Sequence, residues 1–495
     1  MFPLSSIVIV GGGPSSWLAA ATIARVLGAS SQVRVLEIPG GSDTRRGIAS
    51  VPSLHRLLRL LGLDESALMR NTQATFRLGA SFHDWGAIGD RYFSGFGSIG
   101  AKLDAVPFQH HWLRLAALGE SHPLEDFSMA AQAARLGKFA IPQSDPRSVL
   151  SLYSYAWHFD ARLLAAQLRA SALRNGVVAL SGEIAEVELD PELGFVRALV
   201  LQGGSRLEAK QFIDCTGALW PALGIDLEDW SAWLPCDRIQ SLRCASRPEL
   251  PPYSEVTAHA HGWQSVTPLQ NCIVRDFAYG SEFIGDEAAA AQLLEAARGT
   301  ALDAPILRRL NRGRLNQFWV KNCLLLPGET LDPLESSGLH LTQTGISRYL
   351  AHLPVSVLSP ADAAEYNRLT AHEYDRLRDL LVLHYYATRR DDSALWTKCR
   401  ETAVPESLRQ RMALFADSGR ITVGEDEFCG IDGWLSVLSG QGVSPGAYDP
   451  LADVTSLATT RGALTRMSQE MQANAATLPD HRAFIAARGA SAPPA

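Results

Sequence analysis

Residues 11–13 of the chain are three glycines that directly follow the apolar run 7–10 (IVIV) and precede an alanine-rich stretch. This order is typical of a buried strand, a tight turn and a helix. Such a turn lets the backbone approach a pyrophosphate, and the helix N-terminus offers free N–H groups and the positive end of its dipole. We therefore predict a dinucleotide site whose contacts include Gly11, Gly13, Ser16 and Trp17.

The motif departs from the usual G-x-G-x-x-G pattern at one position. Ser16 stands at the third glycine, which serves the packing of the helix against the strand. An acidic residue is expected roughly 20 residues further on, at the end of the second strand, where it binds the ribose hydroxyls. The apolar run 33–36 ends at Glu37, which fits this role. The competing interpretation is a glycine-rich turn in an unrelated α/β protein.

The rest of the chain supplies the elements that must position this site. Alternating apolar residues predict strands near 74–85 and 176–213, and leucines at helical spacing predict a helix over 53–70. The segment 212–217 (FIDCTG) is typical of a strand that closes back onto the nucleotide-binding fold. After residue 347 the pattern becomes helical, most clearly over 360–386.

Composition excludes several classes of protein. A formal net charge of −7 without a long basic run argues against a nucleic-acid partner. No apolar run reaches the roughly 18 residues that a membrane span needs, and the N-terminal apolar run ends in a turn, unlike a signal peptide. The seven cysteines are scattered without a C-x-x-C pair. They predict reduced thiols, no metal site and a cytoplasmic location.

Several separated motifs agree on one family. They are the glycine run with Trp17 and the segments 74–79 (ATFRLG), 155–160 (YAWHFD), 214–217 (DCTG), 319–323 (WVKNC) and 332–338 (DPLESSG). With these motifs in this order, the chain resembles the flavin-dependent tryptophan halogenases over nearly its full length. The resemblance implies an α/β fold: an FAD-binding Rossmann-like body related to the flavin monooxygenases of the aromatic hydroxylase type, with a mostly helical substrate module.

The resemblance also implies a division of the chain and a reaction. The FAD-binding body would cover 1–347, with an inserted substrate-side segment near 88–150, and the helical substrate module would cover 348–495. A separate flavin reductase would deliver reduced FAD. With dioxygen, the reduced flavin would oxidise chloride or bromide to hypohalous acid, which would travel through a tunnel to an aromatic, indole-like substrate.

The resemblance assigns roles to particular residues. Glu335 falls on a glutamate near the substrate, where a carboxylate stabilises the cationic intermediate or accepts its proton, and Ser336 falls on the serine beside it. His110 matches a histidine of the substrate pocket. A capping carboxylate and a solvated histidine are the competing interpretations of Glu335 and His110. The resemblance also implies FAD contacts at Ala49, Thr216, Gly217, Gly328 and Gly338.

Arg77 stands where the family has a lysine that holds or captures hypohalous acid. A desolvated lysine amine can lose its proton and become a nucleophile, whereas a guanidinium essentially cannot, because its pKa lies above about 12. Arg77 can still donate hydrogen bonds, so it is predicted to position the oxidant without forming a covalent haloamine. The alternative is a surface or salt-bridging residue on a strand.

Two other family signatures are altered. The family's Trp-x-Trp-x-Ile-Pro reads WQSVTP over 263–268, so that Ser265 and Thr267 replace bulky residues that wall the flavin from the substrate. Around 427–434 the chain lacks the Asn and the paired Tyr of enzymes that act on free tryptophan. We therefore expect Glu427 and Trp434 to contact a different aromatic substrate, such as a bulkier indole, a phenol or a peptide-borne aromatic.

Three functions remain open at this point. The first is an aromatic halogenase in which Arg77 guides the oxidant. The second is a flavin monooxygenase or oxidase of the same fold without halogenation, which the changes at Arg77, Ser265 and Thr267 favour. The third is a flavin-binding protein without turnover. A homodimer is also left open.

Overall fold

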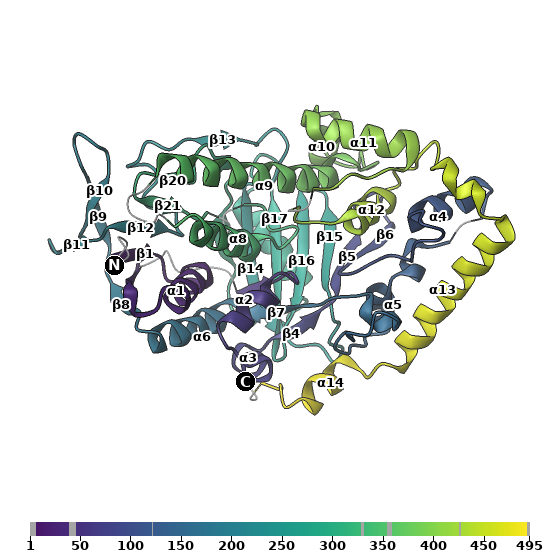
Figure 1. Ribbon diagram of the computed structural model, residues 1–495, viewed down its shortest axis with the longest axis horizontal. Helices are drawn as coiled ribbons and strands as arrows, with labels where there is room; N and C mark the ends of the chain where they lie inside the picture. Colours follow the sequence, from purple (N-terminus) through teal and green to yellow (C-terminus); the bar gives the residue numbers. More distant parts are fainter. Residues whose placement is uncertain are drawn as a thin grey trace.

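The structure is a computed structural model that describes residues 6–38, 46–120, 122–327, 331–353, 359–424 and 427–492. A mostly parallel sheet with its helices lies at one end of the molecule, a large antiparallel sheet lies in the centre, and helices cover the other end (Figure 1). The long helix α9 (Pro360–Tyr386) runs across the parallel sheet and the central sheet, along the edge at which the C-terminal helices α10 and α11 lie (Figure 1).

The parallel sheet contains the predicted nucleotide-binding unit. Its strand order is β20 (Trp319–Val320), β21 (Cys323–Leu325), β12 (Gln211–Asp214), β1 (Ser6–Val10), β2 (Gln32–Glu37) and β8 (Val178–Ser181). Strand β1 pairs in parallel with both β2 and β12. Residues 7–10 are completely buried because helices cover the sheet. The predicted order of strand, glycine turn, helix and strand is confirmed, and so is the return of 212–214 to this sheet.

The central sheet has seven strands. Their order is β18 (Ile306–Arg309), β14 (Arg238–Ala245), β17 (Cys272–Tyr279), β16 (Gly262–Pro268), β15 (Ser254–His259), β5 (Gly79–His83) and β6 (Arg91–Gly95). All neighbours are antiparallel except β15 and β5, which are parallel.

A three-stranded sheet packs beside the central sheet, in the order β3 (Gly47–Ala49), β7 (Ala156–Asp160) and β4 (Thr75–Arg77). Two small antiparallel sheets are formed by β11 (Arg206–Glu208), β10 (Val196–Leu201) and β9 (Ile184–Leu189), and by β13 (Leu227–Asp229) and β19 (Gly313–Leu315).

The strand predicted over 74–85 is split between two sheets at Gly79. Strand β4 belongs to the three-stranded sheet and β5 to the central sheet. Gly79 has a φ of +157°, and a Cβ atom there would lie 2.2 Å from the carbonyl oxygen of Ser94. Only glycine fits this approach of two backbones, so the residue marks the transition.

The described part of the chain contains fourteen α-helices. Those before the central sheet are α1 (Pro14–Leu27), α2 (Leu54–Leu60), α3 (Glu65–Thr72), α4 (Phe108–Ala117), α5 (Met129–Arg135) and α6 (Ala161–Arg174). Those within and after it are α7 (Asp286–Ala296), α8 (Gly338–Ala351), α9, α10 (Ala394–Glu401), α11 (Glu406–Ser418), α12 (Ile431–Gly440), α13 (Leu457–Thr477) and α14 (His481–Ala487). Helices α6 and α8 pack against α1.

The single helix expected over 53–70 is instead two helices, α2 and α3. Gly62 adopts a positive φ of 65° directly after α2, and Asp64 caps α3 by accepting a hydrogen bond from the amide of Ala67 at 2.8 Å. The glycine ends one helix and the aspartate begins the next. The leucine spacing indicated the helical conformation correctly but did not reveal this break.

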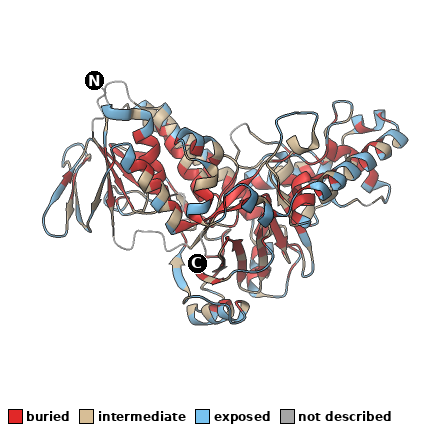
Figure 2. Ribbon diagram, turned by 90° about the horizontal axis from the view of Figure 1, so that it is seen from below, coloured by how far each residue is buried: buried red, intermediate tan, exposed pale blue. Residues whose placement is uncertain are grey.

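One hydrophobic core joins both predicted parts of the chain. It includes residues from Ile7 in β1 to Ile485 in α14. Figure 2 shows buried residues concentrated where sheets and helices meet, with exposed residues on the outer helix faces. The boundary predicted at residue 347 lies inside α8, and the division into a body and a substrate module stays a prediction. None of the described helices combines the length and apolar character needed to cross a membrane.

Candidate active site

The buried side chain of Arg77 at the end of β4 lies between two cavities. The first, which we call the sheet cavity, has a volume of about 50 Å³ and lies between β3, the central sheet and residues 331–339. The second, the loop cavity, has a volume of about 290 Å³ and is bordered by the start of α2, by β6 and by residues 428–433. Arg77 lines both, so it forms part of the wall between them.

The glycine turn lies at the end of β1, next to the turn that follows β12. Gly11 has a φ of +133°, and a Cβ atom there would lie 3.0 Å from the methyl group of Thr216. Gly13 caps α1 without a side-chain hydrogen bond to the helix. The first N–H groups of α1 are therefore available to a ligand. Ser16 is buried and its hydroxyl donates to the carbonyl of Gly13 at 2.9 Å, which explains how serine is accommodated at the third glycine position.

The acidic residue predicted for the ribose lies beside this turn. Glu37 ends β2 and lies against Gly12, and its carboxylate forms an ion pair with Arg169 at 3.1 Å. The guanidinium of Arg169 also lies over the ring of Trp17, 5.4 Å from its centroid. Trp17 is itself buried within the core, so it supports the turn through packing.

The turn after β12 is organised by Asp214. This buried carboxylate accepts hydrogen bonds from the amides of Thr216 at 2.8 Å and Gly217 at 3.0 Å. The turn thereby holds Thr216 against Gly11. A close backbone turn, an open helix N-terminus and an acid at the end of the neighbouring strand together fit a dinucleotide.

Arg77 is fixed by two hydrogen bonds. Its Nη1 donates to the carbonyl of Ser50 at 2.7 Å, and its Nε donates to the hydroxyl of Ser254 at 3.2 Å. The guanidinium lies 5.0 Å from the ring centroid of Phe96. Burial lowers the pKa of Arg77 to about 10, although the nearby carboxylate of Glu335 opposes this shift. The side chain is therefore a buried cation at neutral pH, and the alternative of a surface residue is wrong.

The carboxylate of Glu335 lines the loop cavity and is held by a histidine from α9. Its Oε1 lies 2.5 Å from Nε2 of His384. The other ring nitrogen of His384 lies 3.0 Å from the hydroxyl of Tyr92 on β6, and the imidazole is completely buried. Glu335 thus has a defined position at the border of the cavity, as a base or an electrostatic stabiliser requires.

Ser336 lines the sheet cavity, although it directly follows Glu335. Its φ of +58° is in the left-handed region, which a residue other than glycine adopts at a cost in free energy. This conformation turns the chain so that two consecutive side chains reach opposite sides of the wall. The segment 331–338 is therefore shared by both cavities.

A second contact ties the same segment to the central sheet. The hydroxyl of Tyr385 donates to the carboxylate of Asp332 at 2.7 Å and accepts from the indole N–H of Trp263 at 2.8 Å. Burial raises the pKa of Asp332 to about 6, while the hydrogen bond from Tyr385 opposes the shift. Residues Tyr385, Asp332 and His384 are not suggested by the sequence reasoning. Asp332 could have been predicted, because it belongs to the 332–338 motif. No sequence motif marks Tyr385 or His384.

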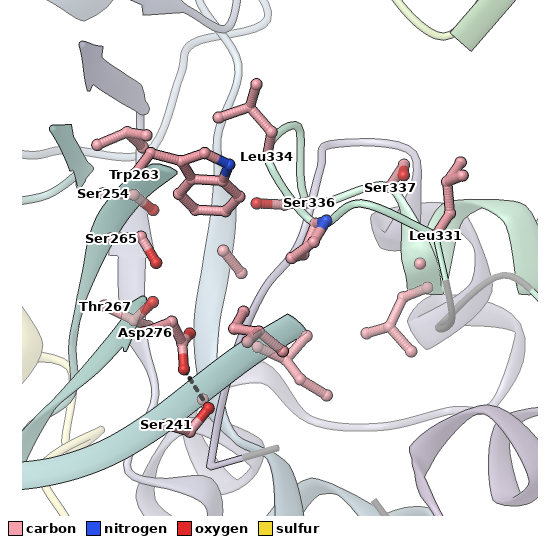
Figure 3. Close-up of a pocket in the computed structure, with 18 of the residues that line it drawn as sticks. Ser241, Ser254, Trp263, Ser265, Thr267, Asp276, Leu331, Leu334, Ser336 and Ser337 are labelled. Atoms are coloured by element: carbon pink, nitrogen blue, oxygen red, sulfur yellow. Dashed lines mark hydrogen bonds between the residues drawn. The ribbon is translucent and has the colours of Figure 1, made fainter. Parts of the chain in front are cut away.

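Small polar side chains form the central-sheet side of the sheet cavity (Figure 3). Ser265 and Thr267 lie two residues apart on β16 and therefore on the same face of the sheet. Ser265 pairs across the sheet with Asp276 on β17. The carboxylate of Asp276 accepts a hydrogen bond from the hydroxyl of Ser241. Bulky residues at 265 and 267 would fill space that here belongs to the cavity. Ala49 and Gly338, two of the predicted FAD contacts, also line it, whereas Gly328 lies outside the described residues.

Three predicted substrate contacts lie in other environments. His110 is buried on α4, and its Nδ1 accepts a hydrogen bond from the amide of Asp449 at 3.2 Å. Trp434 is buried on α12 beneath Arg411, whose guanidinium lies 4.2 Å from the ring centroid. Glu427 forms an ion pair with the same arginine at 2.8 Å.

The segment between Glu427 and Trp434 contributes five residues to the lining of the loop cavity: Phe428, Cys429, Gly430, Asp432 and Gly433. His110, Glu427 and Trp434 themselves are not part of that lining. The middle of the predicted segment 427–434 therefore lines the loop cavity. Its two ends support the segment through the ion pair and the packing described above.

The fold and this site define an α/β dinucleotide-binding protein: a Rossmann-like nucleotide-binding unit joined to a central antiparallel sheet, with a cation and a carboxylate at the wall between two cavities. The chain belongs to the tryptophan halogenase family, whose family profile matches residues 6–456.

Individual relatives agree with this assignment. Tryptophan 7-halogenase KtzQ of Kutzneria sp. (strain 744) is 28% identical over 83% of this chain and 81% of its own. The flavin-dependent halogenase BrvH from Brevundimonas sp. BAL3 superposes with a TM-score of 0.93 at 35% identity, over 99% of each chain. The flavin-dependent halogenase Xcc4156 from Xanthomonas campestris superposes with a TM-score of 0.94, also at 35% identity and over 99% of each chain.

These matches confirm the predicted family, the α/β fold class and the prediction of an FAD-dependent enzyme. A flavin reductase that supplies reduced FAD and an aromatic substrate follow as its partners. Within the described ranges, no three His, Cys, Asp or Glu side chains lie together as ligands for a metal ion.

Proposed function

We propose that this protein halogenates an indole-type aromatic substrate in the loop cavity, using chloride or bromide. The nucleotide part of FAD would lie at the glycine turn, Glu37 and the turn at Thr216, and the flavin ring would lie at the sheet cavity. FAD, when bound and reduced, supplies with dioxygen the oxidising power that converts the halide into hypohalous acid. The observation that carries the proposal is that Arg77 borders both cavities.

Arg77 would guide the oxidant through hydrogen bonds. A guanidinium has five N–H donors, and the bonds to Ser50 and Ser254 occupy two of its nitrogens. With a pKa of about 10, the side chain stays protonated near pH 7 and cannot act as a nucleophilic amine. Arg77 would thus orient hypohalous acid towards the aromatic ring without a covalent bond to the halogen.

Glu335 would act on the aromatic ring. Electrophilic substitution develops positive charge on the ring and then releases a proton, and a nearby carboxylate can stabilise the first and accept the second. His384 holds this carboxylate at the border of the loop cavity. Ser336, on the other side of the wall, would contact the flavin side.

The loop cavity favours an aromatic ring over a complete amino acid. Four glycines line it, Gly95, Gly97, Gly430 and Gly433, and leave flat backbone surfaces. Phe96 and Phe428 add apolar area. Among the described lining residues, only Arg77 and His340 could carry positive charge. Arg77 is held by Ser50 and its remaining donors are assigned to the oxidant, while His340 is held by Ser53 and Glu373. A free α-carboxylate therefore has no dedicated partner in this cavity.

Two finer predictions accompany this function. We infer a cytoplasmic location because all seven cysteines are free thiols in the structure, as a reducing compartment requires. A homodimer remains a prediction, and light scattering of the purified protein measures its mass directly.

The test uses the purified protein with FAD, NADH, a flavin reductase, bromide and a panel of indoles and phenols. We expect products with the bromine isotope pattern in mass spectra. Oxygenated products without bromine would contradict halogenation and support a monooxygenase. If neither product forms and flavin reoxidation is unchanged, the protein binds flavin without turnover. The variant Glu335→Gln should lose brominated product. Glu365→Gln serves as a matched control, because this partly exposed glutamate of α9 pairs with Arg368 and lines neither cavity.

A further inference from the structure

A large surface groove lies next to the loop cavity. It has a volume of about 1180 Å³, and its walls are the helices α2 and α8, with contributions from α9 and the end of α1. The proposed halogenation places the substrate in the loop cavity and the flavin ring at the sheet cavity, so the groove has no part in the function described so far. Its volume is about four times that of the loop cavity.

The groove leads outwards from the active site. Helix α8 contributes a stripe at helical spacing, formed by His340, Gln343, Thr344, Ser347 and Arg348. Helix α2 contributes Arg56, Leu57, Arg59 and Leu60. The residues directly before α2, Pro52 and Ser53, line the loop cavity, and α8 begins at the sheet cavity. Both helices therefore begin at the active site and continue along the groove.

His340 lines both the groove and the loop cavity. Its Nδ1 lies 2.9 Å from the hydroxyl of Ser53, and its Nε2 lies 3.4 Å from the carboxylate of Glu373. The ring of Phe428 meets it edge-on, with centroids 5.1 Å apart. A ligand that continues from the loop cavity into the groove would pass this imidazole.

The acidic residues of the groove already have cationic partners. Glu373 pairs with Arg348 at 3.0 Å as well as with His340. Glu427 pairs with Arg376 at 2.9 Å and with Arg411 at 2.8 Å. Their charge is therefore compensated within the protein.

Two cations on α2 differ from these residues. Arg56 and Arg59 are exposed, and neither forms an ion pair with any residue of the described ranges. They lie three and six residues after Ser53, which corresponds to about 4.5 and 9 Å along the helix axis. The α2 side of the groove thus carries positive charge at a defined distance from the loop cavity.

We propose that the groove binds an acidic extension of the substrate, with Arg56 and Arg59 as the contacts for its anionic group. The substrate is then an indole-type ring whose carboxylate is separated from it by several bonds. This inference rests on the proposed function, because it places the reacting ring in the loop cavity. At about 3.3–3.6 Å per extended residue, the distance corresponds to one to three peptide residues, or to an alkanoate chain of similar length.

Calorimetry provides a readout that does not depend on turnover. The probes are indole, indole-3-butyric acid and its primary amide, and N-acetyl-Trp-Gly-Gly as the free acid and as the amide. We expect each acid to bind about tenfold more tightly than its amide, and this preference to shrink with rising salt because exposed charges are screened. The preferred acid, alkanoate or peptide, identifies the source of the carboxylate.

The double variant Arg56→Gln/Arg59→Gln should remove the preference for acids and leave the binding of indole unchanged. The control is Arg174→Gln at the exposed end of α6, which also lacks an ion pair within the described chain. Thermal melting checks that all variants are folded. In bromination assays, the double variant should raise the KM of the acids about tenfold without changing kcat.

The proposal is overturned if acid and amide bind equally to the unaltered protein, if neither acid binds measurably, or if the double variant keeps the preference. These results differ from a failure of the proposed function. Bromination of indole without any preference for acids would remove the groove proposal alone. A preference for acids that depends on Arg56 and Arg59, without brominated product, would remove the halogenation proposal alone.

Discussion

The sheet cavity and the loop cavity lie on opposite sides of Arg77 and are built from different kinds of structure. The sheet cavity is bordered by strands whose hydrogen-bonded register places Ser241, Asp276 and Ser265 in one row across β14, β17 and β16. The loop cavity is bordered largely by residues 428–433 and by glycines near the end of β6. Strand register fixes side chains within a rigid sheet, whereas loops accept changes in length and composition.

This difference separates the two halves of the function. In the proposed function, oxidant formation would depend on the sheet side, and the choice of substrate would depend on the loop side. The sequence departs from its family on both sides, at Ser265 and Thr267 on the sheet and at 427–434 in the loop. Substitutions that affect only one side can therefore test whether the two cavities act separately.

The largest expected effect is that of Glu335→Gln, on the loop side. Loss of the carboxylate should lower kcat for bromination by about 10²–10⁴-fold, the usual contribution of a general base. Affinity for FAD should stay unchanged because Glu335 does not line the sheet cavity. Turnover with reductase and a fluorescence titration of FAD measure the two quantities. A parallel loss of FAD affinity would show that the cavities are not separate.

Arg77→Ala removes a group that borders both cavities. We expect kcat for bromination to fall about 100-fold, which is typical for loss of a hydrogen-bond donor that stabilises a reacting group. Arg77→Lys should restore activity to within about tenfold, since an ammonium also donates hydrogen bonds. Product formation per NADH consumed is the measurement. If the alanine variant brominates as well as the unaltered protein, the oxidant does not pass Arg77.

Gly11→Ala changes the glycine turn proposed to bind the nucleotide part of FAD, and Gly11 lines neither cavity. Its φ of +133° is strained for alanine, and the added Cβ would lie 3.0 Å from the methyl group of Thr216. We expect FAD affinity to fall about tenfold, corresponding to roughly 1.4 kcal/mol at a strained backbone position. Binding of indole, measured by calorimetry, should not change. Gly28→Ala, at a glycine with open space around it, controls for general loss of helix stability.

The last prediction concerns stability and its dependence on pH, with no expected effect on either cavity. The pKa of Asp332 is raised to about 6 by burial, so the folded state favours its protonated form. This contribution to stability is complete below the unfolded pKa near 4 and is lost as the pH rises through 6. Relative to the unaltered protein, Asp332→Asn should therefore gain up to about 3 kcal/mol in unfolding free energy between pH 4 and pH 7. Urea unfolding at both pH values measures the difference, and a constant difference would contradict it.

Local sequence patterns predicted the nucleotide-binding unit well. The apolar run before Gly11, the helix after it and Glu37 at the end of β2 are all close in sequence, so their periodicity carries the necessary information. The resemblance to a family added Arg77 and Glu335. Both lie at the wall between the cavities in the structure.

Contacts between distant segments could not be predicted in the same way. His384 reaches Glu335 across 49 residues, and Tyr385 reaches Trp263 across 122 residues. A histidine and a tyrosine inside a long helix look like ordinary residues of that helix. His110 was assigned to the substrate on a motif alone, yet its ring accepts a hydrogen bond from Asp449. Only the tertiary structure distinguishes these cases.

Consecutive residues of α9 hold the two ends of the segment that joins the cavities. His384 binds Glu335 and Tyr385 binds Asp332, so the rotation of α9 about its own axis determines where both carboxylates stand. One inserted residue changes that rotation by about 100°. The rotation and the axial position of α9 therefore determine the geometry of the active site. An insertion in α9 before His384 would therefore disturb both contacts together, whereas changes of its exposed side chains would leave them in place.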